Sequence, residues 1–225
     1  MPSDRAQTVP LFSQSSFVVL QPFLGIESFT NLGVSSKISW WLGELGSFLT
    51  IENDEARALP TSLFLRKTPS RLTRASINEW QVDGVLLGVT RVLRTPYIAL
   101  KSTVIKAPAS VEHDLRAQIG WGAGLTPEGD DEVAGFLLVA RALGISHSLV
   151  SSEWKSERTT SFSAALLDAA LHGFAIPVVA SAVREIALGA TTSRSQDALL
   201  TVGHSSGAAL LRGMETAQRC FRRAA

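Results

Sequence analysis

The chain has 225 residues, of which 45% are hydrophobic and 18% are charged, and its formal net charge is +1. This composition provides a hydrophobic core for one large domain or two small ones, and it excludes a highly charged, disordered protein. The balanced charge offers no general attraction for nucleic acid or for anionic lipid, so neither is expected as a partner.

No segment predicts secretion or membrane insertion. The N-terminal residues 1–7 lack the basic and then apolar order of a signal peptide. The most apolar long window, 164–183, is interrupted by charged, glycine and proline residues. Cys220 is the single cysteine, which excludes an intrachain disulfide and a multi-cysteine metal site. We therefore expect a cytoplasmic protein.

The first half of the chain predicts β-strands. Short β-prone runs occur at 17–20, 47–51, 62–65, 84–89 and 97–100. Pro, Gly, Asn and Asp separate these runs, as they do in an antiparallel sheet or a small barrel. Residues 38–45 fit either a strand or a helix.

The second half predicts helices, because Ala, Leu and Arg dominate and glycines stand where helices should end. The expected helices are 112–119, 128–143, 159–172, 177–188, 194–202 and 206–221. Gly144, Gly173 and Gly189 would follow helix ends, Pro177 suits a first helical turn, and the polar segment 151–158 predicts a surface loop. Strands followed by helices indicate an α+β fold, with a β-rich subdomain at 1–108 packed on a helical subdomain at 109–225.

A glycine-rich segment, Gly-Trp-Gly-Ala-Gly-Leu-Thr-Pro-Glu-Gly-Asp-Asp at 120–131, leads into the expected helix 128–143. Helix capping is one interpretation: Thr126 would be the N-cap, Pro127 the first helical residue, and the acidic residues would complement the helix dipole. Capping does not explain the glycines, since Gly129 in a first turn costs about 1 kcal/mol relative to alanine. The glycines favour a backbone that holds an anion at the helix N-terminus.

This turn supplies most of the candidate site. The candidate substrate-binding residues within it are Gly122, Gly124, Leu125, Thr126 and Gly129. Asp130 and Asp131 are candidate catalytic residues and tentative metal ligands, because their charges would repel a bare anion unless Mg²⁺ or a cationic or amide group lay between. The segment is not a Walker-type loop, since no Gly-Lys-Ser/Thr follows the glycines.

A second turn of similar character lies at 199–211, where His204 stands between two expected helices. His204 is either a structural histidine or a donor to an anion, and in the second case a third catalytic candidate. Ser205, Ser206 and Gly207 are further substrate-binding candidates, while either serine could simply cap the last helix. A serine hydrolase is not expected, because there is no Gly-x-Ser-x-Gly elbow.

Other polar residues carry weaker indications. Thr159, Thr160 and Ser163 predict the start of a helix by capping, and they could also face the site. The remaining histidines at 113, 147 and 172 have no spacing typical of a metal site.

Together the two turns resemble a bacterial protein family. Residues 122–135 are similar to its pattern Gly-Leu-Gly-Pro-Gly-Leu-Thr-Pro-Ser-Gly-Asp-Asp-Phe-Leu-x-Gly, and 202–207 to its pattern Leu-Gly-His-(Thr/Ser)-Ser-Gly. The family includes the AllH-type subunit of oxamate carbamoyltransferase. This sequence departs from the first pattern at Ala123 in place of proline, at Glu128 in place of serine, and at Glu132 and Val133.

The resemblance implies a subunit of an enzyme of purine-ring catabolism that moves a carbamoyl group between oxalurate and phosphate, giving oxamate and carbamoyl phosphate. It also implies partner subunits, or a homo-oligomer. The alternative is a non-catalytic subunit that binds a small anion or serves as a scaffold. Exposure of Trp40, Trp41 and Phe48 would favour the scaffold.

Overall fold

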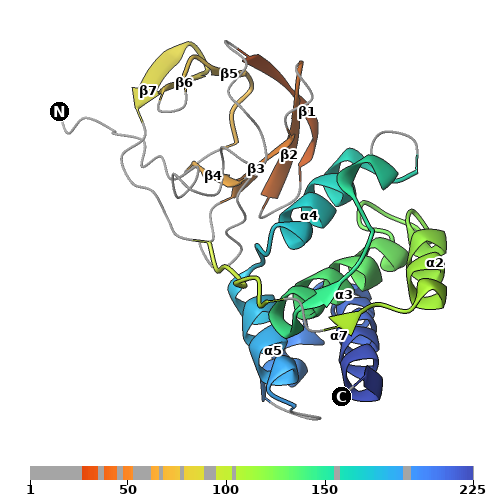
Figure 1. The fold of residues 1–225 in the computed structure, drawn as a ribbon. Coiled ribbons are helices and arrows are strands. Elements are labelled where there is room, and N and C mark those ends of the chain that lie inside the picture. The colour runs from red at the N-terminus through yellow and green to blue at the C-terminus, as the bar shows by residue number, and fades with distance from the viewer. Residues whose placement is uncertain are drawn as a thin grey trace. The chain divides into compact units, whose positions relative to one another are not determined.

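Strands come first in the chain and helices follow, which confirms the α+β prediction (Figure 1). The computed structural model describes residues 27–34, 38–44, 48–52, 62–65, 68–76, 79–88, 95–102, 105–154, 158–189 and 194–224. Two units can be distinguished, residues 1–95 and residues 96–225. In the described residues no helix is both long and apolar enough to cross a bilayer.

The first unit contains a curled sheet whose described strands follow the order β4-β3-β2-β1-β5-β6-β7 (Figure 1). The strands are β1 (Glu27–Val34), β2 (Ile38–Gly43), β3 (Phe48–Glu52), β4 (Ser62–Phe64), β5 (Leu72–Arg74), β6 (Glu79–Val82) and β7 (Val85–Gly88). Neighbouring strands pair antiparallel except β3 and β4, which are parallel. The antiparallel sheet expected for this half is therefore confirmed, with one parallel pair.

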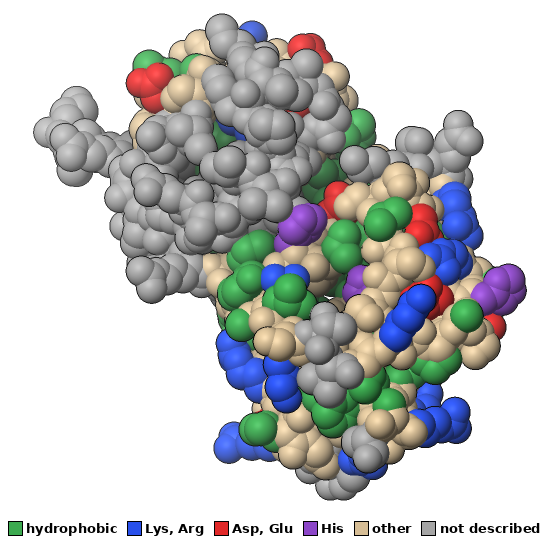
Figure 2. Space-filling view, viewed as in Figure 1, with side chains coloured by type: hydrophobic (Ala, Val, Ile, Leu, Met, Phe, Trp, Pro, Cys, Tyr) green, Lys and Arg blue, Asp and Glu red, His purple; other side chains and the backbone are tan. Residues whose placement is uncertain are grey.

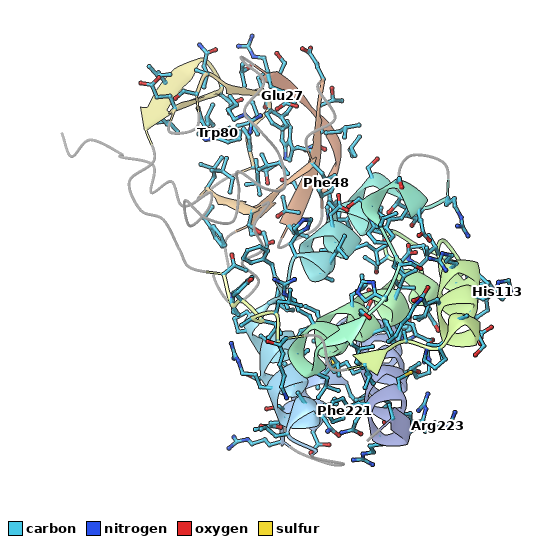
Figure 3. The ribbon with its side chains drawn as sticks, viewed as in Figure 1. Glu27, Phe48, Trp80, His113, Phe221 and Arg223 are labelled. Carbon is cyan, nitrogen blue, oxygen red and sulfur yellow. The ribbon has the colours of Figure 1, made fainter. Side chains whose placement is uncertain are left out.

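The core of the sheet combines aromatic side chains with one buried ion pair. Trp41 and Trp80 are each 1% exposed and pack with leucines and isoleucines of the same sheet. Arg74 Nη2 donates to Glu27 Oε2 at 2.7 Å, and both side chains are buried, so each charge is compensated by the other. Figure 3 labels Glu27 and Trp80 within this unit.

The sequence predicted some strands better than others. The expected runs at 47–51, 62–65 and 84–89 overlap β3, β4 and β7, and the ambiguous segment 38–45 contains strand β2. Strands β1, β5 and β6 were not predicted. The strand expected at 97–100 is wrong, because only Tyr97 forms an isolated bridge, with Phe174. The run at 17–20 lies outside the described residues.

The helices of the second unit match their predicted positions closely. They are α2 (Ala109–Gln118), α3 (Glu128–Leu143), α4 (Ser161–Leu171), α5 (Pro177–Ala187), α6 (Arg194–Leu199) and α7 (Ser206–Ala224), with a short 3₁₀ helix η2 (Ser151–Glu153). Two short parallel strands, β8 (Ile105–Lys106) and β9 (Ile145–Ser146), complete the unit. Gly144 ends α3 with φ +74°, and Pro177 is in the first turn of α5, as predicted.

Helix α3 is the centre of the helical core, and α7 packs tightly against it. A Cβ atom on Gly135 would lie 2.1 Å from the Leu210 carbonyl oxygen, and one on Gly213 would lie 1.8 Å from the Glu132 carbonyl oxygen. The two backbones can approach this closely only because both positions are glycine. The beginnings of the two helices are also close, because Thr126 Oγ1, just before α3, lies 3.4 Å from Ser206 Oγ at the start of α7, and further along a Cβ on Gly213 would lie 2.8 Å from Phe136 N. Helices α3 and α7 therefore run in the same general direction. Their N-termini therefore lie at the same end.

The predicted surface loop at 151–158 contains a core residue and is corrected here. Trp154 has no exposed surface, and its Nε1 donates to Asp168 Oδ1 on α4 at 2.9 Å. The sequence did not predict the burial of Trp154, because its neighbours are polar and a single aromatic residue gives no hydrophobic periodicity. On the face shown in Figure 2, basic side chains are spread over the helical unit among acidic, neutral and hydrophobic ones.

Candidate functional site

The two glycine-containing turns, 80 residues apart in the sequence, meet in space. Thr126 Oγ1, just before α3, lies 3.4 Å from Ser206 Oγ, the first residue of α7. The parallel packing of α3 and α7 produces this contact by placing both helix N-termini side by side. Thr126 was predicted as the N-cap of α3, and this is wrong: Pro127 is at the N-cap position, and the Thr126 hydroxyl pairs with Ser206 instead.

The N-terminus of α4 meets the same turn. Thr160 is the N-cap of α4, since its hydroxyl accepts a hydrogen bond from Ser163 N at 3.0 Å. The same hydroxyl donates to the Leu125 carbonyl oxygen at 2.5 Å. A Cβ on Gly120 would lie 1.7 Å from the Arg158 carbonyl oxygen, so this glycine permits the close approach. The N-termini of α3, α4 and α7, each carrying partial positive charge, therefore surround the turn.

Asp130 holds this arrangement together. Its side chain is 1% exposed, and Oδ1 accepts from the Gly120 backbone N at 2.7 Å. Oδ2 accepts from Ser163 Oγ at 2.7 Å and from the Thr159 hydroxyl. Three donors from two segments thus converge on a single carboxylate. Asp130 fixes the turn against the start of α4.

Asp131 has a very different environment. Its side chain is 7% exposed, and among the described residues its Oδ2 atom is buried without a hydrogen-bond partner. Burial raises the pKa of the Asp131 carboxyl to about 6, the Ser206 hydroxyl opposes the rise, and the charges of Asp130 and Glu128 add to it. A buried carboxylate oxygen without a donor is costly, which suggests that this atom has a role other than stability.

Arg212 on α7 compensates the other acidic residues of the first helical turns. Its Nη2 lies 3.2 Å from Glu128 Oε2, and its Nε lies 3.3 Å from Glu132 Oε2. Glu128 stands where the family pattern has serine, which adds a negative charge at this position. The ion pair with Arg212 on α7 compensates that charge. The pair is partly exposed, so its contribution to stability is small, but it reduces the negative potential at the turn.

The glycines of the turns serve two different purposes. Gly122 and Gly124 have φ values of +113° and +94°, a conformation that favours glycine. Within the described residues, the backbone N–H groups of 122–126 donate to no protein acceptor. In contrast, Gly129 N donates to Trp121 O and Gly207 N donates to Val202 O, each at 2.9 Å. Gly129 and Gly207 therefore allow close packing, while 122–126 present free donors.

The remaining predicted residues of the second turn lie at its surface. His204 is exposed, and its ring has no hydrogen bond to any residue in the described ranges. Ser205 is partly buried, and its carbonyl oxygen accepts from Ala209 N at 3.0 Å in the first turn of α7. Of the second-turn candidates, Ser206 makes the direct side-chain contact with the first turn.

In the described part of the chain, no group of three or more His, Cys, Asp or Glu residues could hold a metal ion. Asp130 and Asp131 form only a pair, and the Asp130 oxygens already accept three hydrogen bonds. His113 is exposed on α2 and is labelled in Figure 3.

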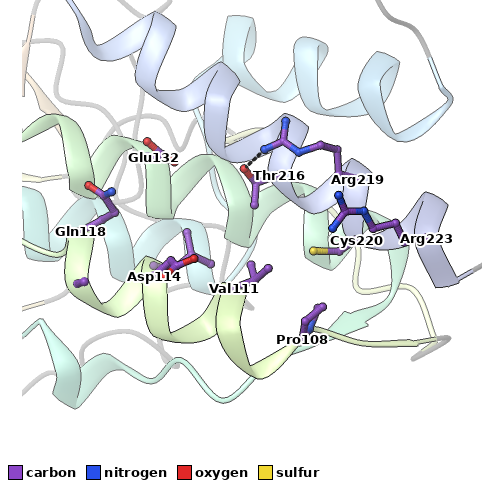
Figure 4. Close-up of a pocket in the computed structure, with 11 residues that line it drawn as sticks. Pro108, Val111, Asp114, Gln118, Glu132, Thr216, Arg219, Cys220 and Arg223 are labelled. Atoms are coloured by element: carbon purple, nitrogen blue, oxygen red, sulfur yellow. Dashed lines mark hydrogen bonds between the residues drawn. The ribbon is translucent and has the colours of Figure 1, made fainter.

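A separate groove of about 480 Å³ lies between α2 and α7 (Figure 4). Its lining includes Asp114 and Gln118 on α2, and Arg219, Cys220 and Arg223 on α7. Arg219 donates to Thr216 Oγ1 at 2.7 Å across one turn of α7. The lining contains none of the site residues that the sequence predicted.

Two apolar side chains of the turn are exposed, Trp121 at 62% and the predicted substrate-binding residue Leu125 at 48%. Trp121 was not predicted as part of the site. The sequence could have indicated it only through its position between Gly120 and Gly122. By contrast, Trp41 and Phe48 are 1% and 4% exposed and Trp40 is partly buried, so the exposure that would favour a scaffold is not observed there.

Comparison with known proteins gives one match. Residues 118–218 match the model of the family described as oxamate carbamoyltransferase subunit AllH. No curated protein and no solved structure gives a significant match. The matched range begins at the glycine-rich turn and includes both motifs, α3, α4 and most of α7. This match over the helical half of the chain supports membership of the AllH family.

Proposed function

We propose that this chain is a subunit of a carbamoyltransferase-type enzyme and that its helical unit binds a small anionic substrate at the turn 120–131. One observation carries the proposal: three helix N-termini surround a turn whose N–H groups at 122–126 have no protein acceptor in the described residues. Free N–H groups and aligned helix dipoles stabilise a carboxylate or a phosphate.

The acidic residues beside the turn are compatible with an anion because most of their charge is already compensated. Three donors hold Asp130, and Arg212 pairs with Glu128 and Glu132. Of these acidic residues beside the turn, Asp131 keeps a buried oxygen that has no partner among the described residues. The anion would lie over the N–H groups of 122–126, while Asp131 faces a different part of the substrate or a bridging Mg²⁺.

The family description names oxamate carbamoyltransferase. The corresponding reaction moves a carbamoyl group between oxalurate and phosphate, with oxamate and carbamoyl phosphate as the products. Every one of these molecules is a small anion, which suits an amide-lined turn. We infer that His204, which is exposed in the second turn, would donate a hydrogen bond to the outer side of the substrate. The turn and His204 would orient the reacting groups and would stabilise the negative charge of the substrate during transfer.

A subunit of such an enzyme needs partners, and the exposed side chains beside the turn fit a covered site. Trp121 and Leu125 would contact a partner subunit, which would shield the substrate from water. Carbamoyl transfer benefits from this shielding, because water competes with the acceptor for the carbamoyl group.

Isothermal titration calorimetry of the whole chain tests the proposal. The ligands are carbamoyl phosphate, oxamate, oxalurate and inorganic phosphate, each with and without Mg²⁺. We expect binding of at least one ligand, and a loss of about tenfold in affinity in Ser206→Ala, because a hydroxyl at the meeting point of the helices is removed. Ser152→Ala, an exposed serine of η2, is the matched control. No binding of any ligand contradicts the proposed anion site.

The alternative, a subunit that binds the anion without catalysis, uses the same residues and differs only in turnover. The exposure of Trp121 and Leu125 at the turn favours this alternative, because a surface that only binds a partner subunit needs no catalytic residues. Conversion of oxalurate and phosphate by the chain, alone or together with its partner subunits, distinguishes the two. If His204→Ala leaves the rate of the assembled enzyme unchanged, His204 takes no part in the reaction.

A further inference from the structure

Where the two turns meet, the side chain of Asp131 is buried with an unsatisfied hydrogen-bond acceptor. Its Oδ2 atom, in the first turn of α3, has no hydrogen-bond partner among the described residues. Adjacent Asp130 accepts three hydrogen bonds in the same helical turn. The missing partner of Asp131 is therefore not explained by a local shortage of donors.

The surroundings of Asp131 indicate which kind of ligand group would supply its missing hydrogen bond. A carboxylate accepts hydrogen bonds and cannot donate them, so its partner must carry N–H or O–H groups. The N–H groups at 122–126 attract the anionic end of a ligand, and Asp131 repels a second anionic end. A molecule that satisfies both has a carboxylate or phosphate at one end and an uncharged N–H donor at the other.

We propose that Asp131 is a specificity-determining residue that accepts a hydrogen bond from the amide nitrogen of the substrate, so that the site selects anions bearing a primary amide. This inference rests on the proposed anion site at the turn 120–131. Oxamate carries a carboxylate next to a primary amide, and oxalate has the same shape with a second carboxylate in place of the amide. Rejection of oxalate would follow from charge repulsion and from an unpaired buried acceptor.

Entry of the ligand requires a small movement, because Oδ2 is closed off from solvent in this structure. The Ser206 hydroxyl beside Asp131 can rotate. The turn also has open space beside it, since no atom of the described residues lies within 4 Å of the Cβ position of Gly124. Both neighbours belong to the two family motifs, at 122–135 and 202–207.

Calorimetric titration of the full chain with oxamate, oxalate and inorganic phosphate tests this role, at about pH 8 so that the Asp131 carboxyl is ionised. We expect the unmodified chain to bind oxamate at least about tenfold more tightly than oxalate. In Asp131→Asn the preference should fall to about threefold or less, because the amide loses its charged acceptor and oxalate loses the repulsion. Asp131→Ser should show the same loss. Asp114→Asn, an exposed carboxylate on α2, is the control and should keep the preference.

Three outcomes would overturn the inference in distinguishable ways. If oxamate, oxalate and phosphate all bind the unmodified chain with similar affinity, the anion site stands and Asp131 does not select the amide. If the preference exists but survives in both Asp131 variants, another residue selects the amide. If none of the three anions binds, the proposed anion site itself fails, and this inference fails with it. Thermal melting of each variant verifies that the fold is retained.

Discussion

Asp130 and Asp131 are adjacent in the chain, yet one carboxylate accepts three hydrogen bonds and the other keeps a buried oxygen without a partner among the described residues. The difference arises from their positions on α3. Asp130 faces the start of α4, where Thr159 and Ser163 supply hydroxyls, and Asp131 faces Ser206 at the start of α7. The two residues should therefore respond in opposite ways to the same substitution.

Asp130→Asn is expected to destabilise the protein. One carboxylate oxygen becomes an NH₂ group that faces donors, and the free energy of unfolding should fall by about 2–4 kcal/mol. Urea unfolding followed by circular dichroism measures the change, with Asp114→Asn as the exposed control. An unchanged unfolding midpoint would show that the three hydrogen bonds do not hold the turn.

Asp131→Asn is expected to stabilise the protein above neutral pH. The pKa of Asp131 is raised from 3.8 to about 6, so the folded chain binds this proton more tightly than the unfolded chain. The carboxyl therefore favours folding below about pH 4, and this contribution is lost as the pH rises through about 6. At about pH 8 the variant should gain on the order of 2 kcal/mol over the unmodified chain.

The pH dependence provides the check on this prediction. The gain from Asp131→Asn should shrink as the pH falls from about 8 to about 4, because Asp131 becomes protonated and uncharged. Chemical unfolding of both proteins at several pH values measures this gain in the free energy of unfolding. A variant that is less stable than the unmodified chain at every pH would indicate that Asp131 is satisfied in solution. A gain in stability together with a loss of oxamate preference would be typical of a binding residue.

Gly213→Ala should separate α3 from α7. The added Cβ would lie 1.8 Å from the Glu132 carbonyl oxygen, a contact that only a backbone movement can relieve. We expect a loss of stability of about 2 kcal/mol or more, and weaker anion binding, because the helix N-termini would move apart. Gly189→Ala is the control: its φ is +95° and no atom of the described residues lies within 4 Å of its Cβ position, so the variant should lose only about 1 kcal/mol. Equal losses in the two variants would contradict the proposed close packing.

Arg212→Ala should weaken anion binding with little effect on stability. Removing the guanidinium leaves Glu128 and Glu132 without their partner near the turn, and the local potential becomes more negative. The affinity for phosphate should fall severalfold at low salt and less at high salt, since screening reduces interactions between exposed charges. Calorimetry at two NaCl concentrations measures it, with exposed Arg194→Ala as the control. A loss that does not depend on salt would argue against an electrostatic cause.

The sequence predicted the helices well because local rules determine them. Helix α3 has the predicted bounds, and Gly144 and Pro177 mark helix boundaries as expected. The strands were harder, since β1 contains Glu27, whose burial depends on Arg74, 47 residues further along the chain. Such a pair leaves no local pattern. Trp154 was likewise assigned to a surface loop because its partner, Asp168, lies on a later helix.

The candidate site was predicted as two separate turns, and their contact could not be read from the sequence. It depends on the parallel packing of α3 and α7, which the glycines at 135 and 213 permit. The sequence did not predict the unequal roles of Asp130 and Asp131 either. Those roles depend on the hydroxyls of Thr159 and Ser163, 29 and 33 residues after Asp130, and on Ser206 in the second motif.

The exposure of Trp121 makes the turn observable without a label. The chain has five tryptophans; Trp41, Trp80 and Trp154 are at most 1% exposed, and Trp40 is partly buried, whereas Trp121 is 62% exposed beside the glycines. Water-soluble quenchers such as iodide will therefore act mainly on the fluorescence of this one indole. A ligand or partner that covers the turn should reduce the quenching and shift the emission to shorter wavelength, giving an optical titration of the native protein.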